Sequence, residues 1–155
     1  MLARFSLSVW ISLLVGLLTL TTAQAQRSPG QVGIGLQVGQ PSGLSLAVYK
    51  PNSIGLDVLA AWDLDNFFYL NPHGVFTSHL GNSERFHLFY GPGAYIGLYD
   101  EGAGGDQARL GISATGGLSV IFGALELYGR ITPRLQLFDQ TNARIGGGLG
   151  IRVYL

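Results

Sequence analysis

Six side chains of this sequence are candidates for acyl-transfer chemistry. A serine nucleophile needs a histidine to take its proton and an acid to orient that histidine. Ser78 and His79 are adjacent, and neighbouring residues of a strand point to opposite faces, so these two could not act together. We therefore predict no catalytic residue and expect that the protein is not an enzyme. The full candidate set is Asp57, His73, Ser78, His79, His87 and Glu126.

The three histidines also raise the question of a metal site. Their spacing, at positions 73, 79 and 87, matches no compact ligand motif, and the chain has no cysteine. The glycine-rich stretches GIG, GPG and GGGLG do not open a helix after a strand, as a nucleotide-binding loop would. We expect neither a metal nor a cofactor.

Composition narrows the class of protein. Charged residues make up 12% of the 155 residues, about half the average of roughly 25% for soluble domains. The formal net charge is zero, which argues against a nucleic-acid partner because such partners need a basic face. A positive mean hydropathy and 24 glycines fit neither a disordered chain nor an ordinary cytosolic domain.

The first 25 residues have the pattern of a secretory signal peptide. Arg4 supplies the positive start, residues 7–20 form a mostly apolar run, and Ala23-Gln24-Ala25 is a small-residue cleavage site. The run is short for a membrane-spanning helix, which needs about 20 apolar residues. We predict a signal peptide over residues 1–25 and one domain over 26–155.

Apolar residues alternate with small or polar ones throughout this predicted domain. The clearest stretch is 143–155, ARIGGGLGIRVYL, where one face is aliphatic and the other carries glycine, arginine and Tyr154. A period of two indicates a β-strand with two unlike faces. The same period predicts eight strands, over 31–39, 43–50, 54–62, 67–79, 86–98, 108–121, 124–137 and 143–155.

Short turns join these eight segments, so neighbouring strands must be antiparallel. We predict an all-β fold, an eight-stranded antiparallel up-and-down transmembrane β-barrel with its aliphatic face toward lipid. The alternative is a soluble periplasmic, lipocalin-like barrel that surrounds an apolar ligand with the same aliphatic face. The other face favours the membrane barrel, because it carries about as many glycines as charges and would be a poor water-facing surface.

A polar network is expected inside such a barrel. Its acids would be outnumbered by arginines, so some guanidinium groups would contact tyrosines, carbonyl groups or water. Eight strands leave an interior that side chains can fill, which argues against a general pore. The predicted lumen network is Asp57, Arg109, Glu126, Arg130, Arg134, Arg144 and Arg152.

Strand number, length and alternation make the chain resemble the small eight-stranded outer-membrane barrels of OmpA and OmpX type. The resemblance implies an outer-membrane location, contact with outer-membrane lipid, insertion by the barrel-assembly machinery, a monomer, and a structural or envelope-interaction role. Members of this family usually end in an aromatic residue that the assembly machinery reads. Here the last residue is Leu155, and Tyr154 lies one place earlier.

The same resemblance keeps an enzyme open as an alternative, since two small-barrel families act on lipid A acyl chains. The deacylase barrels carry a His-x-Ser pair on one strand face, and Ser78-His79 does not match that spacing. In an even-stranded barrel both termini lie on one side, here expected to be the periplasmic one. The connections at 40–42, 63–66, 99–107 and 138–142 would then face outward, and those at 50–53, 80–85 and 121–124 would face the periplasm.

Overall fold

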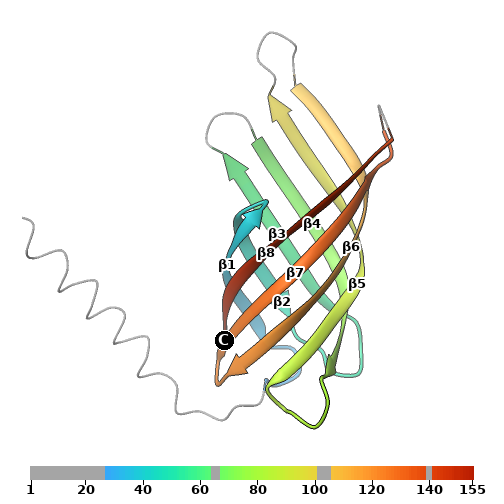
Figure 1. Cartoon of the computed structure of the whole chain (residues 1–155). Coiled ribbons are helices and arrows are strands. Elements are labelled where there is room, and N and C mark those ends of the chain that lie inside the picture. Colours follow the sequence, from blue (N-terminus) through green and yellow to red (C-terminus); the bar gives the residue numbers. More distant parts are fainter. Residues whose placement is uncertain (1–26, 64–66, 101–105, 139–140) are drawn as a thin grey trace, which may run out of the picture.

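The computed structural model describes residues 27–63, 67–100, 106–138 and 141–155, so the predicted signal peptide lies outside the described residues. The described chain forms a closed barrel in which each strand pairs antiparallel with its sequence neighbour and β8 returns to β1 (Figure 1). This architecture confirms the predicted fold class. The strands are β1 (Val32–Gln40), β2 (Gly43–Val48), β3 (Gly55–Asp63), β4 (Phe67–His79), β5 (Phe86–Asp100), β6 (Asp106–Phe122), β7 (Leu125–Gln136) and β8 (Asn142–Tyr154).

The barrel has two unlike ends. We call the end that holds Leu155 and the turns at 49–54, 80–85 and 123–124 the terminal end, and the opposite one the loop end. Strands β5 and β6 reach further toward the loop end than predicted, because their ladder continues through Tyr99↔Gln107 and Asp100↔Asp106. Figure 1 shows that β5 and β6 extend beyond the other strands at the loop end.

Small residues allow the barrel to close. Strands β1 and β8 pair from Gly33↔Tyr154 to Gln40↔Gly147. A Cβ atom on Gly35 would collide with the carbonyl oxygen of Ile151, so only glycine permits this close approach of the two backbones. The β6–β7 turn likewise uses Gly123 at a φ of 61°.

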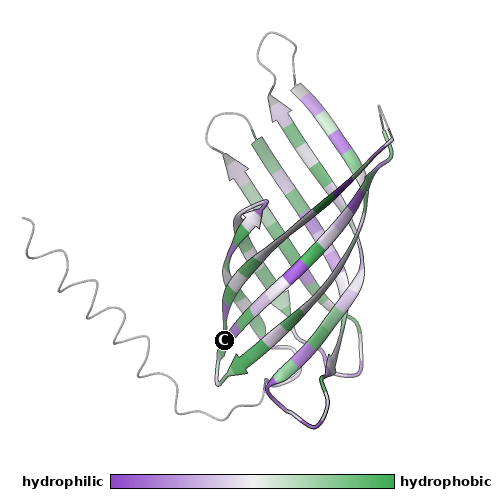
Figure 2. Cartoon of the chain, viewed as in Figure 1, coloured by the Kyte–Doolittle hydropathy of each residue, from purple (hydrophilic) through white to green (hydrophobic). Residues whose placement is uncertain are grey.

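Side chains alternate between the two faces of the barrel wall as the sequence predicts. Aliphatic side chains lie outside, with Ile145 78% and Leu149 74% exposed, whereas Tyr69 and Glu126 inside are 0% and 2% exposed. Figure 2 shows this alternation of hydrophobic and hydrophilic residues along the strands. An interior lined by charges and tyrosines excludes the soluble alternative, which needs an apolar cavity.

Pro72 lies within β4 without shifting the register of the strand. Pro72, within the predicted fourth strand, suggests a bulge or a kink. Instead, β4 keeps one register with β5 from Phe67↔Tyr99 to His79↔His87, without an inserted residue. The ladder between β4 and β5 is interrupted at residues 71–72 and again at 74–75. The described residues also contain no helix that is long and apolar enough to cross a membrane.

Candidate functional site

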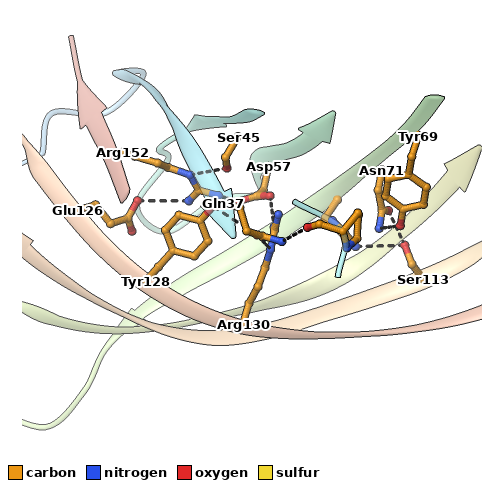
Figure 3. Close-up of polar contacts among 12 residues, drawn as sticks. Gln37, Ser45, Asp57, Tyr69, Asn71, Ser113, Glu126, Tyr128, Arg130 and Arg152 are labelled. Carbon is orange, nitrogen blue, oxygen red and sulfur yellow. Dashed lines mark hydrogen bonds and ion pairs between the residues drawn. The ribbon is translucent and has the colours of Figure 1, made fainter. Parts of the chain in front are cut away.

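Four of the seven predicted lumen residues meet in the terminal half of the barrel. Asp57 comes from β3, Glu126 and Arg130 from β7, and Arg152 from β8. Each occupies an inward position of its strand, and each is at most 4% exposed. Figure 3 shows their side chains converging across the lumen.

Asp57 is the shared acceptor of this group. Its Oδ1 accepts a hydrogen bond from Arg130 Nη1 at 2.5 Å, and its Oδ2 accepts one from Arg152 Nη2. One carboxylate therefore joins guanidinium groups from two strands that are far from β3 in sequence. Bidentate use of both oxygens gives strong, charge-assisted hydrogen bonds.

Arg152 continues the network toward the terminal end. Its Nη1 donates to Glu126 Oε2 at 3.2 Å, and its Nε donates to Ser45 Oγ at 2.8 Å. The guanidinium carbon lies 4.0 Å from the centroid of the Tyr128 ring. All of these partners are buried, so the positive charge of Arg152 is balanced within the barrel.

Arg130 is held in a similar way. Besides its ion pair with Asp57, its Nε donates to Gln37 Oε1 at 2.6 Å. Buried charges cost several kcal/mol each in desolvation, and a network offsets that cost only when its members are well paired. Both oxygens of Asp57 and all three nitrogens of Arg152 have such partners, whereas Arg130 Nη2 is buried without a hydrogen-bond partner among the described residues.

Arg27 is a member that the sequence analysis missed. Its Nη1 donates to Glu126 Oε1 at 3.2 Å and to the Tyr154 hydroxyl at 2.9 Å. Its guanidinium carbon lies 4.4 Å from the centroid of the Tyr49 ring and 4.9 Å from that of Tyr154. We call Arg27, Asp57, Glu126, Arg130 and Arg152 the charge cluster.

Arg27 had one signal in the sequence. It is the first charged residue after the predicted cleavage site. Because it precedes the first alternating segment, the alternation does not say whether its side chain points into the barrel or away from it. Backbone hydrogen bonds carry the pairing of β1 and β2 toward it, from Gly30 N to Tyr49 O and from Tyr49 N to Gln31 O. These bonds hold residues 30 and 31 beside Tyr49 at the terminal end of the barrel.

The other three predicted network residues lie apart, toward the loop end. The Arg134 guanidinium carbon is 5.2 Å from the Tyr69 ring centroid, and that of Arg109 is 4.3 Å from the Tyr99 ring centroid. Arg144 pairs in register with Arg134 and is exposed. Arg134 and Arg109 thus pack on aromatic rings at this end, whereas Arg144 is open to solvent.

A serine and a histidine meet inside the lumen, although not the pair weighed from the sequence. Ser113 Oγ lies 3.1 Å from His73 Nε2 and donates its proton to Asn71 Oδ1 at 2.8 Å. Because a hydroxyl has one proton, this Ser113 is not donating to His73 in the described geometry. Ser78, in contrast, is exposed on the outer wall.

Side chains that could bind a metal do not gather into groups of three or more in the described parts of the chain. Within residues 27–63, 67–100, 106–138 and 141–155, no set of three or more histidine, cysteine or acidic side chains could hold an ion. His79 and His87 are cross-strand partners at the terminal end of β4 and β5.

Comparison with solved structures identifies the fold. The N-terminal β-barrel domain of Pseudomonas aeruginosa OprF matches with a TM-score of 0.63 at 10% sequence identity, covering 81% of this chain and 96% of that chain. Neisserial surface protein A (NspA) matches with a TM-score of 0.48 at 14% identity, covering 79% and 92%. No protein-family model and no curated protein matches the sequence. The predicted resemblance to small eight-stranded outer-membrane barrels is confirmed at the level of the fold.

Proposed function

We propose that the protein is a small integral outer-membrane β-barrel with a structural or envelope-interaction role, and that its lumen is closed by the charge cluster. The observation that carries this proposal is the distribution of side chains. Aliphatic residues cover the outside of the wall, and paired charges fill the inside. Such a large apolar surface would be unstable in water, and it suits the acyl chains of a bilayer.

Aromatic side chains support a membrane position. Exposed aromatics lie toward both ends of the outer wall, with Trp62 and Phe68 near the loop end and Phe76, Phe86 and Phe122 near the terminal end. Aromatic girdles at the two interfaces flank the apolar band of outer-membrane barrels. Phe68 and Phe76 are eight positions apart on β4, about 26 Å along the strand. At a strand tilt of about 35–45°, this spacing corresponds to about 19–22 Å along the barrel axis, slightly less than the roughly 25 Å height of such a band.

The interior supports a closed lumen. The cavity among Asp57, Glu126 and Arg152 is about 20 Å³, which is room for one water molecule. A wider cavity, of about 290 Å³, lies at the terminal end, beyond the Arg27 side chain. Ions that enter this mouth would meet paired guanidinium and carboxylate groups and not a continuous channel.

The outer-membrane location gives a direct test of the proposal. We expect the protein to stay in the outer-membrane fraction until detergent is added, and to migrate differently on gels before and after heating. We also expect no steady conductance when the purified barrel is added to planar bilayers. Release without detergent would contradict the membrane assignment, and a stable ohmic channel would contradict the closed lumen.

The orientation and the partners follow from the same proposal. The terminal end faces the periplasm, the barrel contacts outer-membrane lipid as a monomer, and the barrel-assembly machinery inserts it. Protease added to intact cells should therefore spare a tag placed after Leu155. A tag that is cleaved in intact cells would reverse the orientation.

A lipid A acyl-modifying enzyme is the second candidate, favoured by the 3.1 Å approach of Ser113 and His73. Both residues are buried, and the Ser113 proton is directed to Asn71. We therefore expect lipid A from cells that express Ser113→Ala to be the same as from cells with the unchanged protein. An acyl chain that is modified only when Ser113 is present would favour the enzyme instead.

A further inference from the structure

Two histidines face each other at the terminal mouth of the barrel. His79, at the end of β4, and His87, near the start of β5, are direct cross-strand partners. The centroids of their rings are 4.7 Å apart. Both occupy inward positions of their strands. His79 shares a face of β4 with His73, and His87 shares a face of β5 with Phe89, and both His73 and Phe89 are buried in the lumen. The proximity depends on the β4–β5 register and could not be read from a spacing of eight residues.

The hydrogen bonding of His87 prepares its ring to bind a metal. Its Nδ1 lies 3.3 Å from the backbone oxygen of Arg85. A carbonyl oxygen only accepts hydrogen bonds, so Nδ1 carries the proton and Nε2 keeps its lone pair. A hydrogen bond of this kind, from the second ring nitrogen to a carbonyl group, orients histidine ligands in metal sites.

The space next to this pair can hold an ion with its water ligands. His79 and His87 line the cavity of about 290 Å³, together with Glu84 and Arg27. Arg27 adds a positive charge, but this charge is paired with Glu126. The Glu84 carboxylate adds a negative charge to the same lining and offsets part of the positive charge of Arg27, which shares Glu126 with Arg152.

We propose that His79 and His87 form a two-histidine site for a divalent transition-metal ion at the terminal mouth of the barrel, with water completing the coordination. Imidazole nitrogens suit Zn²⁺, Ni²⁺ and Cu²⁺, and affinities for a given nitrogen site rise toward Cu²⁺. The site takes Cu²⁺ most tightly and Zn²⁺ more weakly. It requires only the folded barrel and is independent of the proposed role in the envelope.

The composition of the chain makes the experiment clean. The sequence has no cysteine and three histidines, so His73, buried deeper in the lumen, provides a matched control. The barrel is purified in detergent without a polyhistidine tag and titrated with Cu²⁺ and Zn²⁺. Electron paramagnetic resonance of the Cu²⁺ sample reports the number of coordinated nitrogens, and unheated gels report folding of each variant.

We expect one Cu²⁺ per barrel, with two imidazole nitrogens coupled to it. His79→Gln and His87→Gln should each weaken binding by at least about tenfold, because loss of even an outer-shell partner of a metal ligand typically costs that much. His73→Gln should leave binding unchanged, and Glu84→Gln should weaken it less than loss of either histidine. Binding that survives both histidine substitutions, a spectrum without two coupled nitrogens, or no binding by the folded wild-type barrel would overturn the proposal. None of these results would change its fractionation with the outer membrane.

Discussion

The two halves of the lumen hold their arginines in different ways. In the terminal half, Arg130 and Arg152 share the Asp57 carboxylate, and Arg27 and Arg152 share Glu126. In the loop half, Arg134 packs on the rings of Tyr69 and Tyr95, at 5.2 and 6.0 Å from their centroids, and Arg109 packs on Tyr99. We call this second group the tyrosine cluster.

The difference shows how each half depends on single residues. A carboxylate has two oxygens and can bridge two guanidinium groups, so much of the charge balance in the terminal half rests on Asp57 and Glu126. A tyrosine ring attracts a cation more weakly than a carboxylate does. Each contact between a cation and a ring contributes only about 0.5–2 kcal/mol, but several rings share the load. Single substitutions should therefore cost more in the charge cluster than in the tyrosine cluster.

Substitution of Asp57 should have the largest effect. Asp57→Leu leaves Arg130 and Arg152 buried without their common acceptor, and we expect a loss of about 3–5 kcal/mol in the free energy of unfolding. Urea unfolding in phospholipid vesicles, followed by tryptophan fluorescence and by unheated gels, measures the change. Glu84→Gln, at an exposed turn, is the control and should change it little. Equal stability of D57L and the wild type would show that the cluster does not hold the barrel together.

A matched pair of arginine substitutions tests the comparison itself. Arg152→Met leaves Asp57 and Glu126 without a cation and should cost about 3 kcal/mol or more. Arg134→Met removes the contacts with two tyrosine rings and should cost about 1 kcal/mol. The same urea titration applied to both variants gives the difference. If R134M proved as destabilising as R152M, the distinction between the two halves would be wrong.

Arg27 should have an intermediate to small effect, because it lies at the edge of the cluster. Arg27→Gln removes the ion pair with Glu126 and the ring contacts with Tyr49 and Tyr154. We expect a loss of about 1–3 kcal/mol, since Arg152 still balances the Glu126 carboxylate. Amide hydrogen exchange in the Arg27→Gln variant should be faster than in the wild type at residues 30 and 49, at the mouth, with little change in the rest of the barrel. Uniform exchange along all strands would contradict a local role for Arg27.

The smallest change is expected for the serine in the middle of the lumen. Ser113→Ala removes the hydrogen bond to Asn71 and the contact with His73, while the Tyr69 hydroxyl still binds Asn71. We expect a loss of about 1 kcal/mol in the free energy of unfolding, typical of one hydrogen bond. A much larger loss would mean that the hydrogen-bonded residues Asn71, His73 and Ser113 join the charge cluster and the tyrosine cluster into a single network.

The sequence by itself determined which side of the wall each residue takes. The strand period of two is local, so the outward position of Leu149 and the inward positions of Asp57, Tyr69 and Arg152 follow from their neighbours alone. Strand boundaries followed almost as well, apart from β2, which ends two residues before the predicted position, and the longer β5–β6 hairpin, where turn-like residues continue the ladder.

Only the tertiary structure decided which inward residues meet. Asp57 reaches Arg130 across 73 positions and Arg152 across 95, and these contacts depend on the stagger with which β8 closes on β1. Likewise, only the folded barrel brings Arg27 to Glu126 on β7 and sets Arg134 against the rings of Tyr69 and Tyr95. Alternation sets the face of a side chain, but its height and its partner across the lumen are set by the register and tilt of all eight strands together.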